Sequence, residues 1–377
     1  MKRILPVIMA LLFLPFPTKA VEVQGKSAVL MDVATGTVLF SQNPEEKLAP
    51  ASVTKIMTML LIMEAVDDGR IMLTDTVTAS ETAAAKGGSQ VYLKAGETMT
   101  VEEMLKSIAV SSANDCACAM AEHLAGSEAA FVEKMNEKAR QLGMDNTTFV
   151  NCTGLDDGPE AAGHRTSAKD IALMSRELLK KHPDIRRFTT IWMDTIRNGT
   201  FGLSNTNKLI RFYPGATGLK TGFTSGAGYC LSATAQRDGM ELIAVVMGAE
   251  TSTGRNESCK QLLDYGFASY ALYTPELTEA APVAVKLGKE DRVSLLLEES
   301  GQLLIEKGQK SSISSEITAE AEVSAPVVKG QRLGTLTLRS GETVLKQLPL
   351  VAAEEVPRLT FGELFVKILR KAAMAKG

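Results

Sequence analysis

The sequence predicts an α/β (α+β) fold in which helices flank an antiparallel sheet, followed by a small all-β domain and a C-terminal amphipathic helix. Three observations support this prediction. Strand-like and helix-like runs alternate up to Thr274-Pro275, short strand-like runs punctuated by glycine follow, and residues 357–377 combine an apolar stripe with basic residues. We therefore expect a first domain at 21–275, a small β-rich domain at 276–355 and a helix over 357–377.

The N-terminus has the pattern of an export signal, and we predict a signal peptide at 1–20. Lys2 and Arg3 form its positive end, and the apolar stretch that follows is interrupted by prolines and too short to span a bilayer comfortably. Small residues precede a predicted cleavage point after Ala20. The alternative is an uncleaved anchor. We expect an exported protein that works outside the cytoplasm.

Composition and charge exclude several classes of protein. The chain has 377 residues and is 45% hydrophobic, which supports a large core. A formal net charge of −3 without a basic patch argues against nucleic-acid binding. The cysteines are odd in number, so at least one is unpaired, and we expect them to be small buried residues. They lack C-x-x-C spacing, and we expect no metal and no cofactor. They are Cys116, Cys118, Cys152, Cys230 and Cys259.

Helices and strands are predicted along the first domain. Residues 27–43 have the pattern of a hairpin, and residues 215–250 that of a loop, strand, turn and strand. The helix at 100–110 opens with a capping box formed by Thr100 and Glu103. Further helices are predicted at 48–70, 115–124, 127–143, 166–183 and 258–272.

The helix at 48–70 begins with a serine and a lysine that could do chemistry. Ser52 precedes Lys55 by three positions, so the two side chains share one face of a helix. The apolar run at 56–63 predicts that protein encloses this helix. A buried lysine loses affinity for its proton and can act as a base, and a serine beside it becomes a nucleophile without histidine. Taken alone, the pattern favours an N-cap serine followed by a surface lysine.

Two further motifs change this balance. Ser112, Ala113 and Asn114 lie at a break between predicted helices, where their side chains can project into a cleft. The sequence Lys220-Thr221-Gly222 offers a cation and a hydroxyl that can receive a carboxylate, and the glycine allows close approach of a ligand. The order S-x-x-K, S-x-N, K-T-G is typical of class A β-lactamases and penicillin-binding proteins.

On these motifs the chain resembles the serine D-alanyl-D-alanine carboxypeptidases, the low-molecular-weight penicillin-binding proteins. The resemblance also includes "NCTGLDD", "GLKTGFTSGAGYCL" and "GAE…RNES", and extends over nearly everything after the signal. It implies a serine β-lactamase/DD-peptidase-like domain that removes the C-terminal D-alanine from peptidoglycan stem peptides. It also implies covalent inhibition by β-lactam antibiotics and attachment to the outer face of the cytoplasmic membrane.

The resemblance implies roles for individual residues. Ser52 would be acylated, with Lys55 as its general base, and Ser112 would help proton transfer to the leaving group in a cleft that Asn114 also lines. The backbone N–H groups of Ser52 and Phe223 would form an oxyanion hole. Substrate-binding residues would be Lys220, Thr221, Gly222, Phe223 and Arg255. The chain departs from the commonest family pattern at Ala113, where glycine is frequent, and at Phe223, where histidine is frequent in some members.

Two alternative functions stay open at this point. One is a β-lactamase of the same fold, although Glu160 lacks the sequence pattern around the glutamate of class A enzymes. The other is a catalytically weak peptidoglycan-binding protein. A histidine-based triad would have to use His123, His164 or His182. We expect a capping role for His182, at a helix end, and a structural role for His164, in a loop.

The C-terminal segment at 357–377 is predicted to be an amphipathic helix. Its apolar stripe comprises Leu359, Leu364, Phe365, Ile368 and Leu369, with Phe361 beside it. Its basic residues are Lys367, Arg370, Lys371 and Lys376. This pattern suits a helix in a membrane interface, and the alternative is a helix packed on the β domain.

Overall fold

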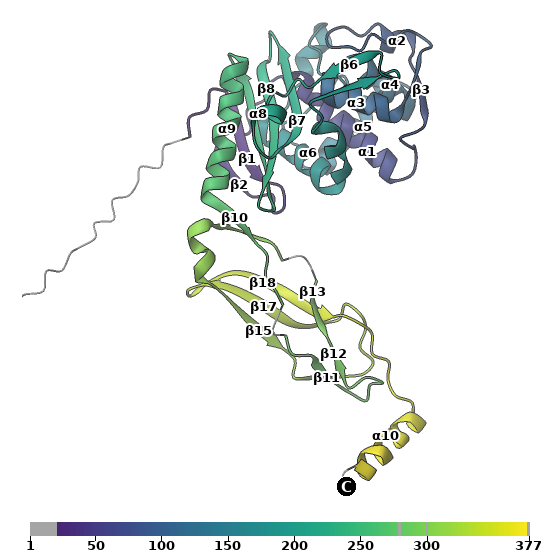
Figure 1. The fold of residues 1–377 in the computed structure, drawn as a ribbon, viewed down its shortest axis with the longest axis vertical. Helices are drawn as coiled ribbons and strands as arrows, with labels where there is room; N and C mark the ends of the chain where they lie inside the picture. The colour runs from purple at the N-terminus through teal and green to yellow at the C-terminus, as the bar shows by residue number, and fades with distance from the viewer. Residues whose placement is uncertain (1–20, 278–279, 299–300, 375–377) are drawn as a thin grey trace, which may run out of the picture.

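The computed structural model describes residues 21–277, 280–298 and 301–374. A larger domain of helices around a sheet is followed by an elongated β domain, and a last helix lies at the far end of the molecule (Figure 1). This is the predicted α+β architecture. The predicted signal peptide lies outside the described residues.

A five-stranded antiparallel sheet forms the centre of the larger domain, in the order β2-β1-β9-β8-β7. Its strands are β1 (Ser27–Asp32), β2 (Val38–Gln42), β7 (Ala216–Thr224), β8 (Gly228–Arg237) and β9 (Met240–Ala249). The predicted hairpin at 27–43 is confirmed. The prediction of a loop at the start of 215–250 was wrong, because that segment pairs with β8 along its length as strand β7. Its glycines conceal the strand, since glycine is depleted in strands, and its threonines do not compensate for them.

Helices cover both faces of this sheet (Figure 1). One face carries most of the helices and the larger core, and the other carries α9 (Ser252–Ser269) with a second core. Helix α9 begins earlier than the predicted 258, because the Thr251 hydroxyl accepts the Gly254 N–H and caps it. The other long helices of this domain are α1 (Lys55–Asp67), α3 (Val101–Ser111), α4 (Asn114–Ala125), α5 (Glu128–Gln141) and α6 (Ala168–Lys181).

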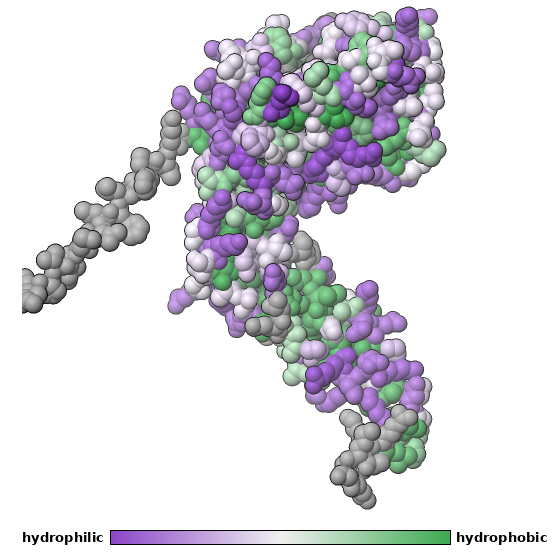
Figure 2. Space-filling view, in the orientation of Figure 1, coloured by the Kyte–Doolittle hydropathy of each residue, from purple (hydrophilic) through white to green (hydrophobic). Residues whose placement is uncertain are grey.

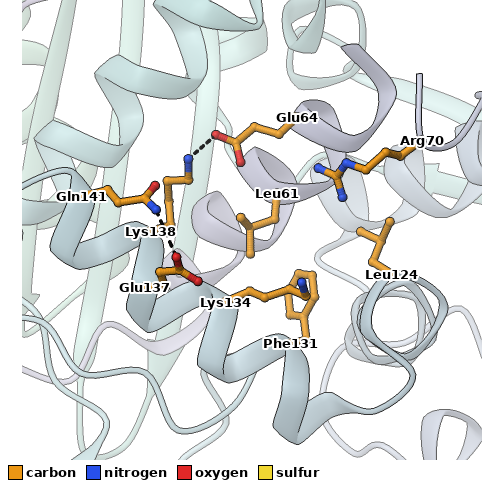
Figure 3. Close-up of a pocket in the computed structure, with 9 residues that line it drawn as sticks. All are labelled: Leu61, Glu64, Arg70, Leu124, Phe131, Lys134, Glu137, Lys138 and Gln141. Atoms are coloured by element: carbon orange, nitrogen blue, oxygen red, sulfur yellow. Dashed lines mark hydrogen bonds and ion pairs between the residues drawn. The ribbon is translucent and has the colours of Figure 1, made fainter. Parts of the chain in front are cut away.

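The helix predicted at 48–70 begins as a 3-10 turn, η1 (Ala51–Thr54), and continues as α1. Most of α1 is buried, as its apolar sequence predicts. The other side of α1 faces α5, where Glu64 forms an ion pair of 2.6 Å with Lys138 (Figure 3). Leu61 and Phe131 line a hollow of about 280 Å³ between these helices (Figure 3). The buried sides of α1 belong to the larger core, which holds the helix in place.

Several short elements of the larger domain were not predicted. Three to five residues give too little periodicity to distinguish a strand or a helix from a loop. The elements are β3 (Thr76–Thr78), α2 (Glu81–Ala84), β4 (Thr98–Thr100), η2 (Pro159–Gly163), η3 (Pro183–Ile185), α7 (Arg186–Thr189), β5 (Met193–Ile196), β6 (Phe201–Ser204) and α8 (Leu209–Phe212). They include the hairpin β5-β6 and the pair β3-β4.

The β domain has its own core of buried valines and leucines between two small sheets. One strand predicted for it, β14, pairs instead with β10, the strand that follows α9, and so links the two domains. The elements are β10 (Tyr270–Tyr273), β11 (Val283–Lys286), β12 (Arg292–Val293), β13 (Leu295–Leu297), β14 (Leu303–Glu306), η4 (Lys307–Ser312), β15 (Ile313–Ala319), β16 (Glu322–Ser324), β17 (Arg332–Ser340) and β18 (Thr343–Ala352).

The last helix, α10 (Phe361–Met374), starts later than the predicted 357. Thr360 and Glu363 cap its start, and Leu359 lies before the helix, with its N–H bonded to the Leu287 carbonyl. Leu359 therefore does not belong to the helical stripe. Phe361 is 87% exposed, and Figure 2 shows hydrophobic side chains at this end of the molecule. Within the described residues, no helix is both long and apolar enough to cross a membrane.

Candidate active site

Ser52 lies in the 3-10 turn that precedes α1, with its side chain half-buried. Ala51, directly before it, has a left-handed φ of 48°, a strain of about 1–3 kcal/mol for a residue with a Cβ. The loop at Gly154 passes so close that a Cβ there would lie 1.8 Å from the Ala51 carbonyl oxygen. The surrounding chain therefore holds Ser52 in a strained, well-defined turn.

Lys55 is fully buried at the first position of α1. Its Nζ lies 2.8 Å from Ser52 Oγ, 2.9 Å from the Thr153 carbonyl oxygen and 3.4 Å from Ser112 Oγ. Burial lowers the pKa of Lys55 to about 7, so a large neutral fraction exists at neutral pH. A neutral amine can donate to Thr153 and Ser112 while it accepts the Ser52 proton. The predicted proximity of Ser52 and Lys55 is confirmed.

Ser112 and Asn114 lie at the junction of α3 and α4, at the predicted break between helices. Ser112 ends α3 with a φ of 63°, and this left-handed turn brings its hydroxyl to Lys55. Asn114 begins α4, and its side-chain Nδ2 donates to the Gly87 carbonyl at 2.7 Å. Its Oδ1 is buried and has no hydrogen-bond partner among the described residues, which leaves an acceptor for another group.

The Lys220-Thr221-Gly222 sequence lies on β7, at the end of the strand order. A Cβ on Gly222 would lie 2.7 Å from the Pro50 carbonyl oxygen and 3.0 Å from Ser52 N, so glycine lets the strand lie against the turn. Lys220 is buried, and burial with the nearby Lys55 and Arg255 cations holds its pKa well below the usual range. Thr221 Oγ1 donates to Thr206 Oγ1 at 2.7 Å.

Phe223 and Arg255 both contact the ring of Tyr229. The Phe223 ring is 55% exposed and stacks on Tyr229, with ring centroids 4.3 Å apart. Arg255 is buried on α9, 5.8 Å from the same ring, and donates to Asn256 Oδ1 and the Cys230 carbonyl. Of the predicted residues, the structure thus brings Ser52, Lys55 and Ser112 into direct contact. Gly222 lies against the Ser52 turn, and Lys220 lies near enough to Lys55 and Arg255 for both to lower its pKa.

Sequence reasoning missed the contribution of the loop at 151–154. The Thr153 carbonyl accepts a hydrogen bond from Lys55, and Asn151 Oδ1 holds this loop by accepting the Thr153 and Gly154 N–H groups. The "NCTGLDD" resemblance pointed to this segment without giving any residue a role. A main-chain carbonyl carries no signature in the sequence, so only the fold reveals it.

His164 supports the turn and takes no part in a catalytic triad. Its Nδ1 accepts the Val150 N–H, so Nε2 carries the proton and donates to Thr54 Oγ1 at 2.8 Å. Thr54 in turn donates to the Ala51 carbonyl. Burial lowers the pKa of His164 to about 4, which keeps it neutral. The predicted structural role of His164 is confirmed, and so is the place of His182 at the end of α6.

All five cysteines are buried and unpaired, as expected for small core residues. In the part of the chain that the structure describes, no group of three or more histidine, cysteine, aspartate or glutamate side chains could hold a metal ion.

Comparisons with known proteins agree with this geometry. Residues 15–251 match the family model of S11 peptidases, described as D-alanyl-D-alanine carboxypeptidase, and residues 276–358 match the C-terminal domain of penicillin-binding protein 5. Among solved structures, penicillin binding protein 5 from Haemophilus influenzae is similar, with a TM-score of 0.74 and 30% identity. That similarity covers 89% of this chain and 98% of the other.

Curated relatives cover nearly the whole chain. D-alanyl-D-alanine carboxypeptidase DacF from Bacillus subtilis (strain 168) is 48% identical over 345 residues, which is 90% of this chain and 87% of the relative. D-alanyl-D-alanine carboxypeptidase DacC from Escherichia coli (strain K12) is 35% identical, over 92% of this chain and 90% of the relative. The chain therefore belongs to the S11 family of D-alanyl-D-alanine carboxypeptidases, which are penicillin-binding proteins.

Proposed function

We propose that Ser52 is the nucleophile that cleaves the terminal D-Ala-D-Ala bond of peptidoglycan stem peptides, with Lys55 as its general base. One observation carries this proposal: a buried amine with a pKa of about 7 lies 2.8 Å from a half-buried serine hydroxyl. Neutral Lys55 takes the Ser52 proton as Oγ bonds to the carbonyl carbon. The C–N bond then breaks, and the proton passes to the departing D-alanine amine with help from Ser112. Water hydrolyses the resulting ester.

The groups around Ser52 suit a D-Ala-D-Ala end. Backbone N–H groups of Ser52 and Phe223 would stabilise the oxyanion, and the close approach of Gly222 to Ser52 N supports this pairing. Because β7 ends the sheet, its free edge can accept an extended peptide as an added strand. Arg255 offers a cation, Lys220 an amine and Thr221 a hydroxyl for the terminal carboxylate. Asn114 Oδ1 is free to accept a substrate N–H.

The wild-type enzyme should release one D-alanine for each diacetyl-Lys-D-Ala-D-Ala peptide consumed. Released D-alanine would be measured with a D-amino-acid oxidase assay, and the same peptide ending in L-alanine is the control. Tight peptide binding without D-alanine release would contradict the proposal and favour a catalytically weak peptidoglycan-binding protein. Rapid turnover of a chromogenic cephalosporin would favour a β-lactamase instead.

We also propose that β-lactam antibiotics acylate Ser52. Penicillin-Binding Protein D2 from Listeria monocytogenes has been solved in an ampicillin-bound form and is 32% identical to this chain, with a TM-score of 0.59. That similarity covers 65% of this chain and 98% of the other. A β-lactam presents a strained amide and a carboxylate in the same arrangement as D-Ala-D-Ala. The stable ester it leaves would block the site.

We further propose that the chain is exported by its N-terminal signal and held on the outer face of the cytoplasmic membrane by α10. Charged contacts tie the start of α10 to the β domain: Glu363 to Lys289 at 3.0 Å and Lys367 to Asp291 at 2.6 Å. The apolar side chains of Phe361, Phe365 and Leu369 stay exposed. A capped helix with an exposed apolar stripe and basic residues suits the surface of an anionic bilayer.

Replacing both Phe361 and Phe365 with serine should move the protein from the membrane pellet to the soluble fraction. Burying one phenylalanine contributes about 1.5–3 kcal/mol, so loss of both should weaken partitioning at least about a hundredfold. Sedimentation with vesicles containing anionic lipid would measure this. Phe212→Ser is a matched control, since Phe212 is 66% exposed on the larger domain. A double variant that pellets like the wild type would refute the anchor.

A further inference from the structure

Glu128, the first residue of α5, makes contacts beside the active site that the mechanism above does not use. Its side chain is 19% exposed. One carboxylate oxygen accepts the Cys152 N–H at 3.1 Å and lies 3.2 Å from the Cys152 thiol. The other forms a 2.5 Å ion pair with Lys86 and lies 3.9 Å from the Cys118 thiol. Four groups from three other segments thus converge on one carboxylate.

Two of these partners adjoin the carbonyls that hold active-site side chains. Cys152 precedes Thr153, whose carbonyl accepts from Lys55, and the Cys152 carbonyl itself accepts the Thr58 hydroxyl of α1. Lys86 precedes Gly87, whose carbonyl accepts from the Asn114 amide at 2.7 Å. Glu128 therefore connects the segment that orients Lys55 with the segment that orients Asn114.

Glu128 lies at a cavity between these two segments. This cavity has a volume of about 350 Å³. It is lined by Lys86 and Gly87 from one segment, by Asn151 and Thr153 from the other, and by Glu128. Burial raises the pKa of Glu128, but hydrogen bonds from Lys86 and Cys152 outweigh it and the pKa is lowered overall. The carboxylate is thus charged at neutral pH and keeps both partners. Without it, the two segments lose the charged connection between Lys86 and Cys152, and small displacements near Lys55 and Asn114 become possible.

We propose that Glu128 is a positioning residue for acylation, acting through Cys152 on Lys55 and through Lys86 on Asn114. The inference rests on the proposed function of Ser52 and Lys55. If the Thr153 carbonyl moves away, Lys55 loses an acceptor that favours its charged form, so its pKa falls. Loss of Glu128 should therefore slow acylation and also shift its pH dependence to lower pH.

Glu128→Ala and Glu128→Gln test this role, with Glu133→Ala as the control on the same helix, where Glu133 is exposed. We expect Glu128→Ala to lower the acylation rate by fluorescent penicillin about tenfold to a hundredfold, the cost of a displacement near 1 Å. The acidic limb of its pH profile should move to lower pH. Glu128→Gln keeps an acceptor for the Cys152 N–H but loses the negative charge that pairs with Lys86. Its acylation rate should therefore lie between those of the wild type and Glu128→Ala. Glu133→Ala should match the wild type.

If Glu128 had a merely structural role, its loss would lower the fraction of labelled enzyme but would leave the acidic limb of the pH profile where it is in the wild type. The inference would be overturned if Glu128→Ala had the acylation rate of the wild type and the acidic limb of its pH profile lay at the same pH. If Glu128→Ala does not fold, the near-isosteric Glu128→Gln decides, and an unchanged rate and limb there would also overturn it. Failure of the wild type itself to be labelled at Ser52 would instead contradict the proposed function, so the two failures are distinguishable.

Discussion

Replacing Ser52 with alanine should abolish both D-alanine release and covalent labelling by penicillin. In the proposed mechanism the hydroxyl forms the acyl-enzyme bond, and the structure places it 2.8 Å from the Lys55 amine, its proposed base. Removing a catalytic serine from a comparable serine–base unit lowers kcat by about 10⁶, so any remaining activity should lie at the detection limit. Mass spectrometry of the protein after incubation with penicillin would measure the adduct.

The control for this experiment is Ser41→Ala on β2, where the serine is exposed at the edge of the sheet. It should be labelled like the wild type. The Ser52→Ala protein should retain its unfolding midpoint, because only a half-buried hydroxyl is lost. An adduct of the same stoichiometry on Ser52→Ala would show that another residue is the nucleophile and would remove the basis of the mechanism.

Replacing Lys55 with methionine should lower the acylation rate by about a hundredfold to ten-thousandfold, the usual contribution of a general base. Methionine has a similar volume and suits a buried position, so the helix should remain folded. Stopped-flow measurement of penicillin acylation, with circular dichroism as a check on folding, would test this. An acylation rate close to that of the wild type would exclude Lys55 as the base.

The pH profile of the wild type gives the same assignment an independent test. Lys55 must be neutral to accept the Ser52 proton, and burial lowers its pKa to about 7. Acylation should therefore rise with pH through about 7 and level off above it, and at one unit below the pKa only about a tenth of the enzyme is competent. A rate that stays constant between about pH 5.5 and 8.5 would contradict a base with this pKa.

Local signals in the sequence were sufficient for much of the fold. The capping box of Thr100 and Glu103 predicted the start of α3, and the Ser-x-x-Lys spacing predicted that Ser52 and Lys55 meet. Both depend on residues three positions apart, where backbone geometry alone sets the distance. The local signals failed on β7, because its glycines weaken the strand pattern and the strand is recognised only through its pairing with β8.

The sequence by itself determined the type and order of most elements and the three motifs that carry the chemistry. Only the tertiary structure decided how the site works. Burial of α1 among several elements brings the pKa of Lys55 near 7, and the Thr153 carbonyl that orients its amine lies 98 positions away. Glu128 meets Lys86 across 42 positions. Such contacts depend on how distant segments pack together, and no local pattern of side chains encodes a backbone carbonyl or a desolvated amine.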